Sequence, residues 1–177
     1  MEFRGRIEKP DENGEIPLLI GHYSIIKINI PTNKINPKIV IYGLGSCIAL
    51  ILMDKKNRVG GMSHILLPKA HPQIIIKYPH KYAELSVKLL YKELVDIGAE
   101  KNHIAAIIVG GSRIFNLNEN KMGVDNSIVV KDQLSRLKIR LLNEDLGGSR
   151  GRGVIFDTND FSVSVKFSGE SNYRLII

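Results

Sequence analysis

The sequence predicts an α+β fold, built as a layered α/β sandwich in which two main helices pack on mixed β-sheets. Strand-like runs occupy the beginning and the end of the chain, and two segments with helical periodicity lie between them. The length of 177 residues, with 44% hydrophobic residues, fits one globular domain with a sizeable core. We expect this domain to span residues 18–177 and to follow an irregular N-terminal extension, residues 1–17, which is rich in charge and turn formers.

A strand, a short strand and a β-hairpin are expected in the first part of the domain. Apolar and polar residues alternate over residues 23–30, which predicts a strand that ends before Pro31. A shorter strand is expected over residues 38–42. Two apolar runs, residues 48–53 and 59–67, flank a polar segment and therefore predict the β-hairpin.

The middle of the chain predicts two helices and a buried strand. Residues 81–97 carry apolar side chains at alternating spacings of four and three, which places on one helix face Ala83, Val87, Leu90, Leu94 and Ile97. Gly98 suits the position that follows this helix. Residues 104–109 are continuously apolar, as in a buried strand. A second helix is expected over residues 125–137, with Asp125 as its N-cap and with the inward-facing side chains Ile128, Val129 and Leu134.

The last part of the chain returns to strands. Residues 139–142 are expected to form one strand, and residues 154–157 and 161–167 form a second hairpin with strict alternation. The Gly- and Arg-rich residues 143–153 are expected to form a loop, and residues 173–177 a last strand. Strands therefore flank the helical middle of the chain on both sides.

The first hairpin can bring together a thiol and an imidazole, those of Cys47 and His64. If its loop is centred between Lys55 and Lys56, Cys47 faces His64, and opposed Cβ atoms on one face lie roughly 4.5–5.5 Å apart. A four-residue loop with this centre suits the sequence better than a two-residue Lys-Lys turn. A one-residue bulge would instead send the two side chains to opposite faces.

A thiol beside an imidazole is a nucleophile with its base. The protonated histidine stabilises the thiolate, and it can then protonate a leaving group. Gly45 and Ser46 precede Cys47 in a glycine-containing turn that can aim backbone N–H groups at an oxyanion. A lone cysteine among apolar residues is also often a small core residue, so spacing alone leaves catalysis and packing as alternatives.

Several ordered motifs occur along the chain, namely GLGSCIA at residues 43–49, GGMSHILLP at 60–68, KYA at 81–83, GGS at 110–112 with Phe115, Gly123 with Asn126, and DLGG at 145–148 with Arg152. Together they resemble the CheD family of chemoreceptor glutamine deamidases. The resemblance covers about residues 20–165 and implies a CheD-like α/β sandwich. It also implies that Cys47 is the nucleophile and His64 its partner in hydrolysing the side-chain amide of receptor glutamines to glutamate.

One position departs from the pattern of that family. The family often has a threonine six residues before the cysteine, where this chain has Ile41. An isoleucine side chain forms no hydrogen bond, so we expect the backbone carbonyl of Ile41 to take the third, orienting position. The alternative is a weakened member that acts as a chemotaxis adaptor, since losing the orienter of a triad lowers the rate.

Further residues are expected near the catalytic pair. Gly110 and Gly111, with Ser112, follow the expected strand at residues 104–109, and in a CheD-like protein they let a loop approach the pair. We expect these three residues and Tyr82, near the start of the first helix, to contact the substrate. The loop lacks a complete dinucleotide or P-loop pattern, which argues against a nucleotide at this position.

Composition limits the partners and the compartment. The net charge is +7, but the basic residues are scattered and tryptophan is absent, which argues against nucleic-acid binding. No apolar run is long enough for membrane insertion, no secretory signal is recognisable, and a single cysteine suits the reducing cytoplasm. His71 and His80 have no companions at metal-ligand spacing, so neither a metal nor another cofactor is expected.

The resemblance implies two partners, the cytoplasmic helices of a chemoreceptor (a methyl-accepting chemotaxis protein) and a CheC-type phosphatase. We expect the protein itself to be a monomer. A non-catalytic adaptor would use the same face to bind these partners. A cysteine hydrolase of small amides is a second alternative, which an enclosed pocket would favour over the open groove that a protein substrate needs.

Overall fold

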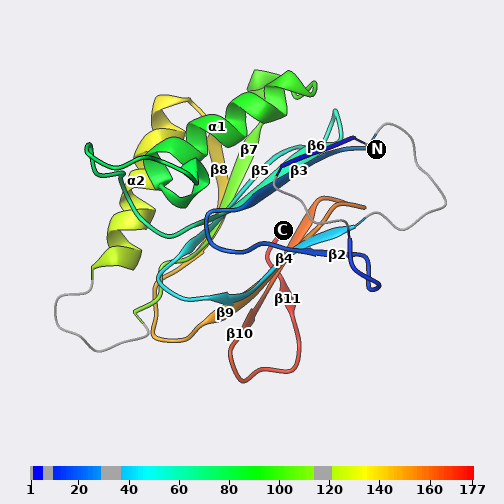
Figure 1. Ribbon diagram of the computed structural model, residues 1–177. Coiled ribbons are helices and arrows are strands. Elements are labelled where there is room, and N and C mark those ends of the chain that lie inside the picture. Colours follow the sequence, from blue (N-terminus) through cyan, green and yellow to red (C-terminus); the bar gives the residue numbers. More distant parts are fainter. Residues whose placement is uncertain (1, 6–9, 29–36, 114–120) are drawn as a thin grey trace.

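The computed structural model describes residues 2–5, 10–28, 37–113 and 121–177. Residues 29–31, at the end of the predicted strand, and the motif residue Phe115 lie outside these ranges. Within them the chain forms the predicted α+β sandwich, with two mixed sheets and two main helices (Figure 1). None of the helices in these ranges is long and apolar enough to cross a membrane.

The larger sheet has six strands and carries the helices on one face (Figure 1). Its spatial order is β1 (Glu2–Gly5), β3 (Tyr23–Lys27), β6 (Val59–Ile65), β5 (Ile48–Asp54), β7 (Ala105–Gly110) and β8 (Arg140–Leu146). The helices are α1 (Ala83–Asp96) and α2 (Met122–Arg136), and the short 3-10 helices are η1 (Pro79–Lys81) and η2 (Lys101–His103). β7 and β8 run parallel because the chain crosses between them through α2.

The smaller sheet has five strands and covers the opposite face of the larger sheet (Figure 1). Its spatial order is β11 (Arg174–Leu175), β10 (Ser162–Phe167), β9 (Arg152–Asp157), β4 (Lys38–Leu44) and β2 (Glu15–Pro17). The molecule therefore has three layers: the helices, the larger sheet and the smaller sheet. One apolar core lies on each side of the larger sheet.

The strand β5 is buried on both faces and contributes to both cores. The core beneath the helices contains its side chains Ile48, Leu50 and Leu52. The core between the sheets contains Ala49, Ile51 and Met53. A strand covered on both faces has no side that favours polar residues, which explains why residues 48–53 are continuously apolar.

The hairpin of β5 and β6 has the predicted four-residue loop, residues 55–58, but the prediction of its centre was wrong by one residue. Ala49, and not Cys47, lies opposite His64. The buried carboxylate of Asp54 accounts for this, because it accepts hydrogen bonds from the Asn57 N–H (3.0 Å) and side-chain amide (2.7 Å) and so closes the turn.

The two segments that begin and end the predicted N-terminal extension are not irregular. Residues 2–5 form β1, which pairs antiparallel with β3, and residues 15–17 form β2, which pairs parallel with β4. Both segments are short and polar, so their own sequence carries little strand signal. They become strands because each adds to the edge of a sheet whose neighbouring strand offers unpaired backbone groups.

The five residues predicted for the inner face of α1 are all buried. Two details of α2 and the end of β8 differ from the prediction. Lys121 is the N-cap of α2, so Asp125 lies in its first turn. Ile128 is 58% exposed and Val130 takes the buried position. β8 extends to Leu146, into the predicted loop, because its parallel pairing with β7 continues to that residue.

Candidate functional site

Cys47 and His64 lie on the same interior face of the larger sheet, between the two sheets. Cys47 directly precedes β5 and belongs to the apolar cluster that includes Ala49 and Met62. His64 follows Met62 by two residues in β6 and therefore points to the same side. The loop-centre shift preserves this arrangement, because it moves the pairing by two residues and leaves Cys47 diagonal to His64. Only 7% of Cys47 and 5% of His64 is exposed.

The segment of residues 18–22, which we call the His64 clamp, holds this histidine by three hydrogen bonds. The backbone N–H of His64 donates to the carbonyl of His22 (3.0 Å), and the N–H of Gly21 donates to the carbonyl of His64 (2.8 Å). The ring nitrogen Nδ1 lies 3.0 Å from the carbonyl oxygen of Leu18. Because a carbonyl only accepts hydrogen bonds, this contact assigns the proton of the neutral ring to Nδ1.

The second ring nitrogen of His64, Nε2, is buried and has no hydrogen-bond partner among the described residues. Burial lowers the pKa of His64, an effect that the Leu18 carbonyl opposes and nearby His22 strengthens. Burial also raises the pKa of the Cys47 thiol to about 11. The site therefore rests as a neutral thiol and a neutral imidazole whose Nε2 lone pair can accept a proton.

The carbonyl that contacts the His64 ring belongs to Leu18, whereas the sequence led us to expect that of Ile41. The backbone N–H of Leu18 donates to the carbonyl of Val40 (2.9 Å) and so continues the parallel pairing of β2 with β4. Ile41 is 2% exposed in β4 and lines the same cavity as His64. No local pattern indicates the Leu18 contact, because it joins residues 46 positions apart.

The turn that carries Cys47, residues 45–47, is held from inside the protein by its three carbonyl groups. In chain order these accept hydrogen bonds from the Ser112 N–H (2.9 Å), the Asn126 side-chain amide (3.1 Å) and the Gly111 N–H (2.9 Å). The peptide bonds are trans, so each N–H points opposite to the carbonyl of its own peptide unit. The two N–H groups within the turn therefore point away from these partners.

Gly110 and Gly111 lie directly behind Cys47, so this loop approaches the Cys47 side of the predicted pair. Gly110 has a φ of +120°, and a Cβ atom there would come within 2.2 Å of the Cys47 carbonyl oxygen. Any side chain at this position would push the nucleophile turn away. The loop thus supports Cys47 from the interior, and its predicted contact with substrate stays a prediction.

Asn126 of α2 joins the two segments that carry the pair. Its side-chain amide donates to the carbonyl of Ser46 (3.1 Å), which precedes Cys47, and to the carbonyl of Leu66 (2.8 Å), which follows His64 by two residues. Asn126 is fully buried, and its Oδ1 atom has no hydrogen-bond partner in the described ranges. This amide therefore fixes the separation of the two segments. The sequence motif contains Asn126 but does not indicate this role.

A buried arginine ties the loop behind Cys47 to the smaller sheet. Arg152 of β9 is 3% exposed, and its guanidinium donates to Asp145 Oδ1 from Nε (3.0 Å) and from Nη2 (2.9 Å). It also donates to the hydroxyl of Ser112, which in turn donates to the carbonyl of Arg150 (2.7 Å). The network fixes the loop at residues 110–112 relative to β8 and β9.

A cavity of about 540 Å³ opens beside His64 and is lined mostly by apolar side chains from the His64 clamp and β4. Three large side chains on the wall of this cavity are strongly exposed, namely those of Leu19 (63%), Ile20 (47%) and Tyr42 (61%). Tyr78 also lines this cavity, whereas Tyr82 is buried at the N-cap of α1. Within the described ranges, no three metal-ligating side chains gather into a metal site.

The fold and the site define an α+β sandwich protein with a thiol and an imidazole on one interior face. A profile of the family described as CheD chemotactic sensory transduction matches residues 66–167, which is more than half of the chain. Curated relatives also span most of it. The chain therefore belongs to the CheD family.

Two relatives show how far the similarity extends. A Clostridium botulinum protein (strain Hall), named probable chemoreceptor glutamine deamidase CheD, is 40% identical over 151 residues, which cover 81% of this chain and 93% of the relative. A Clostridium acetobutylicum protein with the same name is 39% identical over 136 residues, which cover 75% of this chain and 82% of the relative.

Replacing Arg152 with methionine should lower the free energy of unfolding by about 2 kcal/mol, because it removes the buried cation that pairs with Asp145 and leaves this carboxylate with the more exposed Arg174. Urea denaturation of both proteins measures the difference. The matched control is Arg136→Ala, whose pair with Asp132 lies on the surface of α2 and contributes roughly 0.3–0.5 kcal/mol. Equal losses in the two variants would contradict a supporting role for the buried network.

Proposed function

We propose that this protein is a glutamine deamidase that converts specific chemoreceptor glutamines to glutamate during chemotactic adaptation. The observation that carries this proposal is the arrangement of Cys47 and His64 on one interior face, with Nδ1 of the histidine occupied and Nε2 left without a partner. Membership of the CheD family supports the reaction, and relatives named chemoreceptor glutamine deamidase support the substrate.

The first half of the reaction forms a thioester. As the substrate carboxamide enters, the Cys47 thiol transfers its proton to Nε2 of His64 and the sulfur adds to the carboxamide carbon. The N–H groups of Ser46 and Cys47 point away from Ser112 and Asn126 and can stabilise the oxyanion. Collapse of this intermediate breaks the C–N bond, and the imidazolium returns the proton to the departing ammonia.

The second half releases glutamate. His64, neutral again, takes a proton from water as the water oxygen attacks the thioester carbon. The C–S bond then breaks, and the proton on Nε2 returns to the Cys47 sulfur, which restores the thiol. The Leu18 carbonyl keeps Nδ1 protonated throughout, so that Nε2 is the nitrogen that exchanges protons in both halves.

A protein substrate fits the surroundings of the pair better than a small amide does. The cavity beside His64 carries exposed apolar side chains from the His64 clamp and β4. Residues Ile74, Ile75 and Ile76, in the segment that leads to Tyr78 at the cavity, are 45%, 97% and 40% exposed. Exposed apolar surface of this kind commonly marks a protein-binding region. Helices of a receptor cytoplasmic region would bury it.

The alternative is an adaptor that binds the receptor and a CheC-type phosphatase without catalysis. One observation favours it, because a thiol that is 7% exposed and has its pKa raised to about 11 is a poor nucleophile until substrate binds. The adaptor would use the same apolar surface. Cytoplasmic localisation and a monomeric state are part of both proposals.

Cys47→Ala should abolish conversion of glutamine to glutamate because it removes the proposed nucleophile. It should leave receptor binding unchanged, because the exposed apolar side chains proposed to bind the receptor belong to the His64 clamp, to β4 and to residues 74–76. Mass spectrometry of tryptic peptides from a receptor cytoplasmic fragment, incubated with wild type or variant, measures the conversion. Lys88→Ala, on the exposed side of α1, is the control and should retain full activity. A fragment that both proteins bind but neither converts would establish the adaptor instead.

The dependence of kcat/KM on pH should show an acid limb with its midpoint below pH 6.5, the ordinary value for histidine. The sign follows from the buried environment, because a lowered pKa keeps the imidazole neutral, and therefore basic, to a lower pH. Activity is thus retained at neutral pH and lost on acidification. Initial rates of ammonia release across buffers of constant ionic strength measure this limb, and a midpoint above 7 would argue for a different base.

Asn126→Ala should lower kcat by about tenfold to a hundredfold, since a small displacement of reacting groups has effects of this size. The variant should change KM little, because Asn126 is fully buried behind the site. Steady-state kinetics with the receptor fragment separate the two constants. A thermal melt confirms that the variant is folded, and an unchanged kcat in a folded variant would show that the amide does not position the pair.

A further inference from the structure

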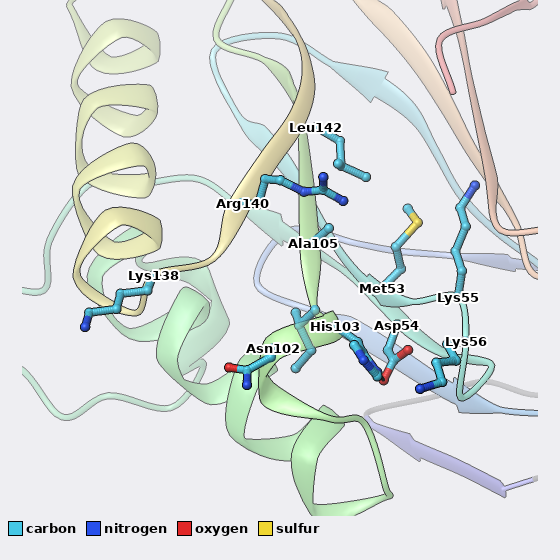
Figure 2. A pocket seen from close by; sticks show the side chains of 11 residues that line it. Met53, Asp54, Lys55, Lys56, Asn102, His103, Ala105, Lys138, Arg140 and Leu142 are labelled. Carbon is cyan, nitrogen blue, oxygen red and sulfur yellow. Dashed lines mark ion pairs between the residues drawn. The ribbon is translucent and has the colours of Figure 1, made fainter.

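A second cavity, of about 580 Å³, lies at the other end of the β5–β6 hairpin from the thiol and the imidazole. β5 begins beside Cys47 and ends at Asp54 in the wall of this cavity, so the two ends are about 20 Å apart. The other wall residues come from the hairpin loop, from η2 and the start of β7, and from the start of β8 (Figure 2). The proposed deamidation uses none of them.

Four basic side chains line this cavity, and they are Lys55, Lys56, Lys138 and Arg140. Within the described part of the chain, no carboxylate lies within ion-pair distance of any of them. Some exposed cations elsewhere do have such partners, as Lys131 has in Glu144 (2.7 Å) and Arg150 has in Glu170 (3.1 Å). The cavity is thus a concentration of positive charge that the fold itself does not neutralise.

The carboxylate of Asp54, which also lines the cavity, is already committed to the fold. It is fully buried and accepts hydrogen bonds from Asn57 and from the N–H of Glu100 (2.9 Å). Burial acts to raise the pKa of Asp54, but these hydrogen bonds outweigh it and the pKa is lowered. Asp160 does not line the cavity, although the charge of Lys55 helps to lower its pKa after two larger effects, burial, which acts to raise the pKa, and hydrogen bonds from Ser162, which lower it. The basic side chains therefore outnumber the acidic ones at the cavity.

Apolar side chains separate the cations. Figure 2 shows Met53, Ala105 and Leu142 between Arg140 on one side and Lys55 on the other, whereas Lys138 points away from this group. A wall of this kind suits a ligand in which an apolar ring is joined to an anionic group. The volume lies within the range of about 300–1,000 Å³ that is typical of small-molecule sites.

We propose that this cavity binds a small phosphate-bearing ligand of the nucleotide class. Its phosphates would contact Lys55 and Lys56, because ammonium groups bind phosphate well. Its base would lie against Met53 and Leu142, with the guanidinium of Arg140 on the far side of the base, where it can stack on the ring. The site is separate from the thiol–imidazole pair and does not depend on the proposed deamidase activity.

Isothermal titration calorimetry of the full chain with ATP, inorganic pyrophosphate and adenosine, each without divalent metal, tests the proposal. ATP should bind about tenfold more tightly than pyrophosphate, and adenosine should bind most weakly, since phosphate contacts supply most of the affinity. The double variant Lys55→Ala/Lys56→Ala and the single variant Arg140→Ala should each weaken ATP binding by about fivefold or more. These positions are exposed, so the variants should fold, which a thermal melt verifies.

The matched control is Lys88→Ala/Lys92→Ala, which removes the same charge from the exposed side of α1 and should change ATP affinity by less than about twofold. Absence of ATP binding to the wild-type chain would overturn the proposal. If the control variant weakened ATP binding as much as the cavity variants do, the proposal would be overturned too. That result would mean that ATP responds to the net charge of the protein and not to this cavity. Equal affinities for ATP and pyrophosphate would overturn the assignment of a base to the apolar wall.

Discussion

The burial of β5 on both faces is the constraint on which the rest of the structure depends. β5 pairs with β6 on one side and with β7 on the other, and its side chains enter both cores. A strand with no solvent-facing side requires both a helical layer and a second sheet to cover it. Because Cys47 immediately precedes this strand and β6 carries His64, the same packing that forms the cores places the thiol and the imidazole on one interior face.

Burial sets the chemistry of the pair as well as its position. Removal from water disfavours every charged form, so it raises the pKa of the Cys47 thiol and lowers that of the His64 imidazole. An ion pair of thiolate and imidazolium would have to overcome the desolvation of both groups. The neutral pair avoids this cost at rest, and in the proposed reaction the proton moves when a substrate carbonyl is present to share the developing charge. The His64 clamp serves this arrangement because it fixes which nitrogen receives that proton.

The two ends of the hairpin differ in character although they belong to one element. The end beside His64 has an apolar cavity with exposed hydrophobic side chains, which suits a protein surface. The other end has basic side chains around Asp54, whose carboxylate organises the loop and contributes little attraction for a cation. Contacts from distant elements hold each end. Asn126 of α2 holds the first, and the Glu100 N–H beside η2 holds the second.

The sequence by itself determined the layers, and it brought Cys47 and His64 forward as the proposed reactive pair. The apolar run at residues 48–53, the helical spacing of Ala83 to Ile97 and the alternation at residues 161–167 each reflect local burial, which leaves a periodic pattern in the chain. The predicted hairpin placed Cys47 and His64 on one face even though its centre was wrong by one residue. A shift of one residue in the centre moves each pairing by two residues, and because side chains alternate with period two, both side chains stay on the same face. Only the tertiary structure decided which carbonyl fixes the imidazole, which amide joins the segments of Cys47 and His64, and which residues gather at the cationic cavity. Leu18 and Asn126 meet their partners across dozens of residues, and Arg140 reaches the cavity from a strand far along the chain from the hairpin. Such arrangements depend on how sheets and helices stack, for which no local pattern exists.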